Sequence, residues 1–156
     1  MMSHKNLLDL EQHREPLLSI LREVIAKPDL TPDQLNRLQR KHHQMYGRDT
    51  LIRAYREFAG AHGLPPYDAT VIERLRLKPV RTASGVTPVT VLTKPFPCPG
   101  ECIFCPNDVR MPKSYLSDEP GAQRAEQNSF DPYLQTYTRL ASYHNTGHPT
   151  DKIELI

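Results

Sequence analysis

Apolar residues in the first half of the chain recur at steps of three and four positions, which is typical of amphipathic helices. Their positions predict four helices, at about 15–26, from Pro32 to Met45, at 50–61 and at 69–76. Pro16 suits the first turn of the first helix, and Thr31 before Pro32 pairs an N-cap with a first-turn proline. Gly47 is the expected end of the second helix. Short helices of this kind can bury their apolar faces against one another.

The second half of the chain mixes strand and helix signals. Val86–Thr93 is rich in β-branched residues and predicts a strand, and Ile153–Ile156 predicts the start of a second, parallel strand. Two helices are expected between them, at about 120–128 and 131–144. The packing face expected for the second of these helices consists of Tyr133, Leu134, Tyr137, Leu140 and Ala141. The order of elements predicts an α/β fold class, with one βαβ part after a small helical domain.

Composition adds a domain boundary and a cellular compartment. The chain has 156 residues, with 15 prolines against 7 glycines, so long stiff connections are expected. We place a basic helical region at 1–79 and a second domain at 80–156. No apolar run approaches the roughly 18–20 residues of a membrane span, and the N-terminus lacks a signal-peptide pattern. A cytoplasmic protein without membrane contact is therefore expected.

Charge is distributed unevenly along the chain. Residues 1–82 carry 14 Lys and Arg against 10 Asp and Glu, whereas residues 83–156 carry 6 against 8. Composition alone leaves RNA binding and an ordinary solvated surface as equal interpretations of the basic half. If the partner is RNA, adjacent helices would present the phosphate contacts. The residues ranked first for such contacts are Arg37, Arg40, Lys41, Arg48 and Arg53.

All three cysteines lie in one loop, at 94–106, with the sequence K-P-F-P-C-P-G-E-C-I-F-C-P. Cys98, Cys102 and Cys105 have the spacing C-x3-C-x2-C, so a loop that folds back can aim three sulfurs at one point. Thiolates are soft anionic ligands, and three that converge indicate a thiophilic metal. The four prolines and one glycine of the loop exclude regular helix and central strand.

The number of cysteines separates the candidate metal sites. A structural zinc site has four protein ligands, and His144 or His148 could supply the fourth, but each lies about forty residues downstream, outside the usual short ligand spacing. A simple electron-transfer [4Fe–4S] cluster needs four cysteines. A disulfide is disfavoured by the odd cysteine count and the crowding of the thiols. A [4Fe–4S] cluster with one iron left open for a substrate explains three cysteines best.

The cysteine spacing resembles the signature of the radical S-adenosylmethionine enzymes, in which three cysteines hold a [4Fe–4S] cluster and S-adenosylmethionine chelates the fourth iron. Three flanking segments narrow the resemblance: K-P-V-R-T-A-S-G-V-T-P-V-T-V-L-T-K-P at 78–95, D-P-Y-L-Q-T at 131–136 and D-K-I-E-L-I at 151–156. Together with the cysteine loop, they resemble the Elongator protein 3 family. In this family many members have a longer gap between the first two cysteines, and two glycines where Asn107 and Asp108 stand here.

The resemblance implies a fold, cofactors and a reaction. Residues 80–156 would begin the partial (β/α) barrel of radical S-adenosylmethionine enzymes, with Phe104 near the adenine of that cofactor. Members are tRNA-modifying transferases that also use acetyl-CoA, and their N-terminal region contributes to tRNA binding. A 5′-deoxyadenosyl radical would take hydrogen from an acetyl group, which would then add to the wobble uridine and give a carboxymethyl-type product.

Two further expectations concern the extent and the class of the protein. One crossover is too small a core for a barrel, so we expect an N-terminal fragment, inactive by itself, of an enzyme that works alone or in an Elongator-like assembly. The alternative is an RNA-binding module whose cysteine loop is held by structural zinc or by a cluster and performs no catalysis. Iron with acid-labile sulfide would favour the enzyme, and about one zinc per chain would favour the module.

Overall fold

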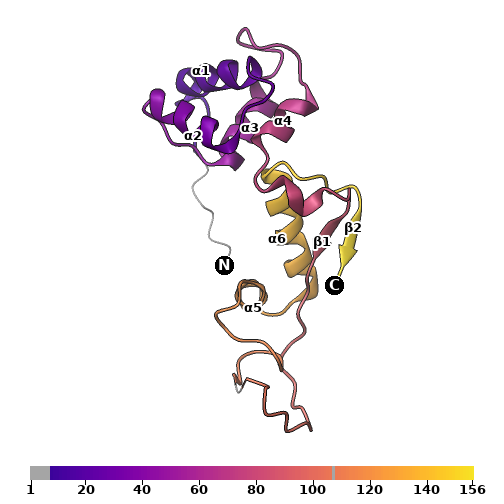
Figure 1. Cartoon of the computed structure of the whole chain (residues 1–156). Helices are drawn as coiled ribbons and strands as arrows, with labels where there is room; N and C mark the ends of the chain where they lie inside the picture. The colour runs from indigo at the N-terminus through magenta and orange to yellow at the C-terminus, as the bar shows by residue number, and fades with distance from the viewer. Residues whose placement is uncertain (1–7, 107) are drawn as a thin grey trace. The chain divides into compact units, whose positions relative to one another are not determined.

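The computed structural model describes residues 8–106 and 108–156, which divide into two compact units. The first unit runs to Val80 and includes Asn145–His148, and the second comprises Arg81–His144 and Pro149–Ile156. No helix in these described ranges combines the length and the hydropathy needed to cross a membrane. In chain order the elements are α1 (Arg14–Ile25), α2 (Pro32–Lys41), α3 (Arg48–Phe58), α4 (Ala69–Leu75), the 3-10 helix η1 (Pro79–Thr82), β1 (Thr87–Val89), α5 (Pro120–Gln127), α6 (Pro132–Asn145) and β2 (Ile153–Leu155) (Figure 1).

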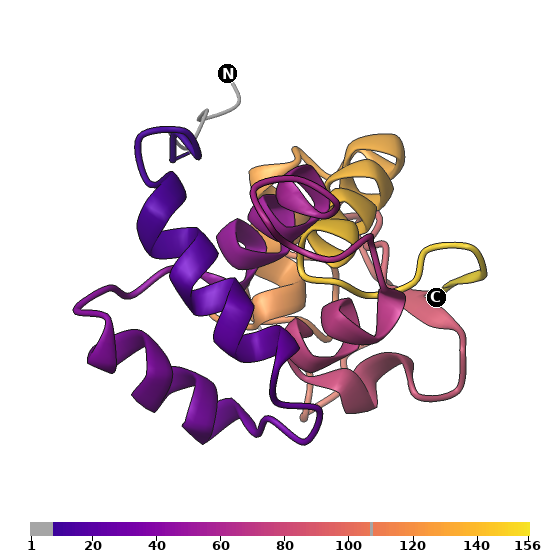
Figure 2. The same cartoon turned by 90° about the horizontal axis from the view of Figure 1, so that it is seen from above.

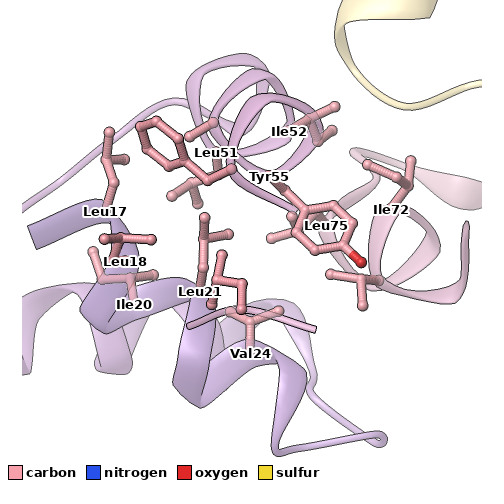
Figure 3. Packing of buried hydrophobic residues seen from close by; sticks show 14 of the residues in the cluster. Leu17, Leu18, Ile20, Leu21, Val24, Leu51, Ile52, Tyr55, Ile72 and Leu75 are labelled. Carbon is pink, nitrogen blue, oxygen red and sulfur yellow. The ribbon is translucent and has the colours of Figure 1, made fainter. Parts of the chain in front are cut away.

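The hydrophobic core of the first unit lies between helices α1 to α4. Leu21 of α1, Tyr55 of α3 and Leu75 of α4 are fully buried, and their side chains gather in one cluster (Figure 3). Helix α2 lies beside α1 and adds the fully buried Leu35 (Figure 2). Burying one such side chain contributes about 1.5–3 kcal/mol, so this cluster is the main source of stability for the unit. The four helices predicted from apolar spacing are confirmed.

Helix α2 begins where the sequence predicts and ends earlier. Thr31 Oγ1 accepts from Gln34 N at 3.3 Å, and Gln34 Oε1 accepts from Thr31 N at 2.9 Å, which completes a capping box. The helix ends at Lys41 because His43 adopts a left-handed φ of 54°, with its N–H bonded to a carbonyl of the last turn. The predicted end at Gly47 was therefore wrong, since that glycine is the N-cap of α3.

A short segment that begins at the last residue of α6, Asn145–His148, belongs to the first unit. Arg76 Nε donates to Gly147 O at 2.7 Å, and the buried His148 donates from Nε2 to a backbone carbonyl at 2.7 Å. Gly147 has a φ of +83°, and a Cβ there would lie 3.0 Å from Ile52 Cδ1. Only glycine suits this position, because the backbone is left-handed and pressed against the helical core.

The second unit contains a parallel pair of strands, with α6 in the connection between them. The register places Thr87 opposite Ile153 and Val89 opposite Leu155. The pairing continues beyond the strands, because Val91 N donates to a carbonyl of the last residue at 2.9 Å. The predicted parallel pair is confirmed, although each strand has only three residues. The fold is α/β with little sheet, and these two strands do not by themselves show a barrel.

The packing face predicted for α6 was partly wrong. Tyr133 and Tyr137 are 72% and 55% exposed, and their rings stack with centroids 6.1 Å apart. The buried residues of the helix are Gln135 and Tyr143, and both bond to the backbone of β1 and its continuation. The helix thus buries polar side chains that complete backbone hydrogen bonds, a role that an apolar pattern does not reveal.

Candidate metal site and nucleic-acid face

The backbone just before the cysteine loop is held by a side chain of α6. The Gln135 side chain accepts from Leu92 N at 3.0 Å and donates to Leu92 O at 2.9 Å, so it completes both backbone hydrogen bonds of that residue. In a wider sheet, the N–H and C=O of Leu92 would instead bond to a neighbouring strand. Beyond the loop, Met111 is buried with Leu92, Ala122 and Ala125 in a small apolar cluster. Helices α5 and α6 therefore hold both ends of the loop.

Replacing Gln135 with leucine should weaken this attachment. The variant keeps a similar volume but leaves the buried N–H and C=O of Leu92 without partners, so we expect the free energy of unfolding to fall by about 2–4 kcal/mol. Chemical denaturation measures this change, and hydrogen exchange at the Leu92 amide reports it locally. Gln127→Leu, on the exposed side of α5, should change the free energy by less than about 0.5 kcal/mol. Unchanged protection of the Leu92 amide in Gln135→Leu would contradict this role.

Local turns place two of the three sulfurs on either side of one glycine of the loop. Gly100 N donates to Cys98 Sγ at 3.4 Å, and Cys105 N donates to Cys102 O at 3.1 Å. A Cβ at Gly100 would stand 3.5 Å from Cys98 Sγ and 3.7 Å from Cys102 Sγ, so these two sulfurs flank the glycine. Cys105 Sγ lies 4.0 Å from Ser114 Oγ. In the described part of the chain, no three His, Cys, Asp or Glu side chains are arranged as a metal centre.

A hollow of about 370 Å³ lies beside two of the cysteines. Its lining consists of Gly100, Glu101, Cys102, Ile103, Cys105 and Lys113. Lys113 also lines a second hollow of about 350 Å³, together with Phe96 and Asp108. A lysine at this place puts a positive charge next to ligands that bind metal as anions. The three thiols are the donor type that a thiophilic metal prefers, although the described loop does not bring them together as one site.

Phe104 in the loop and Asp108 just after it have distinct environments. Phe104 is 92% exposed. Asp108 closes the following turn, because its carboxylate accepts from Ser117 N at 3.2 Å and from Arg110 N at 3.1 Å. Hydrogen bonding from the Ser117 side chain first and from the Arg110 backbone second holds the pKa of Asp108 below its ordinary value. The aspartate that departs from the family pattern thus organises the turn, while Asn107 lies outside the described residues.

The five basic residues predicted to contact RNA fall into two groups. Arg37, Arg40 and Lys41 are exposed on α2. Arg48 and Arg53 of α3 are half-buried, and burial lowers the pKa of Arg48. Arg48 Nη1 and Arg53 Nε are buried without a hydrogen-bond partner in the described structure, and the Arg53 guanidinium also donates to a backbone carbonyl. The three residues on α2 are therefore the more accessible to a ligand.

Glu23 of α1 contacts this basic surface, and sequence reasoning missed it. Its carboxylate accepts from Lys41 Nζ at 3.0 Å, from His42 Nε2 at 2.7 Å and from Lys27 Nζ at 3.4 Å. Hydrogen bonds from Lys41 first and His42 second lower the pKa of Glu23 from its ordinary value of 4.5 to about 2. No local pattern reveals the contact, because 18 positions separate Glu23 from Lys41 and tertiary packing brings them together.

Substitution of Glu23 should change how stability depends on pH. A lowered folded-state pKa means that the ionised carboxylate stabilises the fold above pH 4.5, and this contribution is lost as the pH falls towards 2. We expect Glu23→Gln to be less stable than the native chain by about 1 kcal/mol at pH 7, with the two converging at pH 2. Urea denaturation at both pH values measures this difference. Glu57→Gln, an exposed position on α3, should show no such convergence, and a difference for Glu23→Gln that does not depend on pH would contradict the assignment.

Comparison with known proteins places the chain in a family. No family model matches it. It is 51% identical to the tRNA uridine(34) acetyltransferase of Dehalococcoides mccartyi over 76 residues. These residues cover 49% of this chain and 17% of that protein. The corresponding enzyme of Methanocaldococcus infernus is also 51% identical, over 92 residues that cover 55% of this chain and 17% of that protein.

A eukaryotic relative matches a longer part of the chain. Elongator complex protein 3 of Drosophila melanogaster is 34% identical over 161 residues, which cover 93% of this chain and 28% of that protein. The chain thus spans between 17% and 28% of the length of these relatives. The resemblance seen in the cysteine loop and its flanking segments is confirmed by these identities. The chain belongs to the family of the tRNA uridine(34) acetyltransferases and Elongator complex protein 3.

Proposed function

We propose that this chain is the part of a tRNA uridine(34)-modifying enzyme that holds a [4Fe–4S] cluster and contacts tRNA. The observation that carries the proposal is the single loop with Cys98, Cys102 and Cys105, held at both ends by α5 and α6. The names of the relatives support the tRNA substrate and the transferase class. Under this proposal, residues 80–156 belong to a radical S-adenosylmethionine domain and residues 1–79 to a tRNA-binding region.

The residues of the loop have separate tasks in this proposal. The three cysteines are the protein ligands, and the N–H of Gly100, 3.4 Å from Cys98 Sγ, stabilises negative charge on that sulfur. Lys113, which lines the hollow beside the cysteines, offsets further charge. The exposed ring of Phe104 is available to stack on the adenine of S-adenosylmethionine. When bound, the cluster would leave one iron open to S-adenosylmethionine and would supply the electron for its reductive cleavage.

Substrate binding is assigned to the first unit. The exposed Arg37, Arg40 and Lys41 of α2 would contact RNA phosphates. The half-buried Arg48 and Arg53 of α3, the next helix along the chain, would add further contacts. The co-substrate would be acetyl-CoA, and the product a uridine with a carboxymethyl-type group. We propose catalytic turnover only for proteins of the relatives' full length. Such proteins would act either alone or in an Elongator-like assembly.

Metal analysis after anaerobic reconstitution with iron and sulfide tests this function. We expect about four irons and four acid-labile sulfides per chain. About one zinc per chain without sulfide would overturn the proposal and would favour an RNA-binding module with structural zinc. The same analysis on protein purified without reconstitution controls for metal that is added nonspecifically, since a native site should retain part of its iron.

A further inference from the structure

We propose that Cys98 and Cys102 form a redox-sensitive pair that a peroxide converts into a reversible disulfide. We call these two residues the cysteine pair. The disulfide is a covalent modification of two thiols, and it differs from the binding of a metal by all three cysteines under the proposed function. The effect of the modification on metal uptake rests on that proposed function, whereas the disulfide itself does not.

The two sulfurs of the cysteine pair lie close to the same glycine. A Cβ placed on Gly100 would stand 3.5 Å from Cys98 Sγ and 3.7 Å from Cys102 Sγ, so the sulfurs are no further apart than the sum of these two distances. Gly100 N also donates to Cys98 Sγ at 3.4 Å, which holds the turn around this sulfur. Rotation of the two side chains moves each sulfur, so the gap to a disulfide bond of about 2 Å can close within the loop.

The third cysteine, Cys105, has a different environment. Its Sγ lies 4.0 Å from Ser114 Oγ, and its side chain is half-buried, while both residues of the cysteine pair are exposed. Among the described residues, the three cysteines are not arranged as one metal centre. The odd number of cysteines disfavours a disulfide when the sequence is considered alone. In the structure, however, the three thiols separate into one pair and one thiol that contacts a serine.

The cysteine pair is open both to a small oxidant and to movement. A hollow of about 370 Å³ lies beside Cys102, which is ample room for a peroxide molecule. The neighbouring side chains of Ile103 and Phe104 are almost fully exposed, and neither cysteine of the pair belongs to an apolar cluster. A disulfide can therefore form without disturbing the packing of either cluster.

The reaction with hydrogen peroxide is balanced without another reactant. One sulfur attacks the peroxide, the O–O bond breaks, and a sulfenic acid and one water form. The second sulfur displaces the hydroxyl group of the sulfenic acid, so the S–S bond forms and a second water leaves. The two thiol hydrogens end in these waters, and the chain becomes lighter by about 2 Da. A thiol reductant reverses the modification by exchange.

Mass spectrometry of the whole chain tests the inference. The chain is freed of metal with a chelator, treated with one equivalent of hydrogen peroxide and alkylated at its remaining thiols. We expect most of the chain to carry one disulfide and one alkyl group. Cleavage after Glu101, between the residues of the cysteine pair, separates Cys98 from the other two cysteines. The two peptides should stay joined, with the alkyl group on Cys105, until dithiothreitol separates them.

Two controls separate the structure of the loop from the mere presence of thiols. Cys105→Ser keeps the cysteine pair and should form the disulfide to the native extent, whereas Cys98→Ser and Cys102→Ser should each abolish it. In urea the cysteines are neighbours only along the chain, so we expect a mixture of pairings there. The folded chain should instead give one pairing.

Iron uptake measures the consequence for the proposed metal site. A disulfide withdraws two of the three thiol ligands, so the oxidised chain should bind only a small fraction of the iron and sulfide that the reduced chain binds on reconstitution. Treatment with dithiothreitol before reconstitution should restore the native amount.

Three outcomes would overturn the inference. Alkyl groups on all three cysteines, or sulfinic acids in place of a disulfide, would show that the pair does not close. A disulfide to Cys105 in the folded chain, or the same mixture of pairings as in urea, would show that the structure does not select the pair. Native iron uptake by the oxidised chain would show that the disulfide does not block the site. A reduced chain that binds no iron would contradict the proposed function alone, because the disulfide is detected by mass.

Discussion

Serine in place of any one of Cys98, Cys102 and Cys105 should reduce the iron and sulfide bound after reconstitution to a small fraction of the native amount. The hydroxyl has nearly the shape of the thiol, but it is a hard and weakly acidic donor that soft iron–sulfur clusters accept poorly. With only three cysteines in the chain, no other thiol can replace a missing ligand. Iron and sulfide analysis, with the absorbance of the cluster, measures the loss.

The fold of the helices should survive these substitutions. Cys98 and Cys102 are exposed and Cys105 is half-buried, and none of them belongs to either apolar cluster. Far-ultraviolet circular dichroism should therefore be unchanged while the metal is lost. Thr90→Ser, an exposed change before the loop, should bind the native amount of iron. Native iron content in two or more of the cysteine variants would exclude the three cysteines as the ligand set.

Alanine at Tyr55 should have the largest effect on the stability of the first unit. The side chain is fully buried among α1, α3 and α4, and removing a buried aromatic ring costs about 3–5 kcal/mol. Its hydroxyl also accepts from Asp68 N at 2.8 Å and so positions the N-cap of α4. Because small domains are stable by only about 5–15 kcal/mol, the unit should be close to unfolding. Hydrogen exchange of amides in α1 and α3 measures the change.

Two further variants separate the contributions of the ring and of the hydroxyl. Tyr55→Phe keeps the ring and should lose only about 1 kcal/mol. Tyr137→Ala removes a tyrosine that is mostly exposed on α6 and should change the free energy of unfolding by less than about 0.5 kcal/mol. If Tyr55→Ala were as stable as Tyr137→Ala, the helical core described for the first unit would be wrong.

Local signals explain which elements could be predicted from the sequence. The helices α1, α3 and α4 each carry apolar residues at helical spacing, and that spacing depends only on neighbours along the chain. The end of α2 could not be predicted, because His43 takes a left-handed conformation that glycine usually adopts. The buried Gln135 could not be predicted either, since its partner is a backbone 43 positions away.

The candidate site also has a part that the sequence predicts and a part that it does not. The cysteine spacing is visible in the sequence because all three ligands lie within eight positions of one loop. The contacts of Glu23 and the docking of Asn145–His148 both join residues that are distant in sequence. Such contacts follow from tertiary packing, and a single sequence without aligned relatives carries no local sign of them.

Electron paramagnetic resonance of the reduced, reconstituted chain tests most directly whether the three cysteines leave one iron open. The spectrum is recorded with and without S-adenosylmethionine under anaerobic conditions, with Cys102→Ser as the control that should give no cluster signal. We expect a [4Fe–4S] signal whose shape changes when S-adenosylmethionine is added, because the cofactor coordinates the fourth iron. A chain without a cluster signal, or with a signal identical in both samples, would contradict the proposed site.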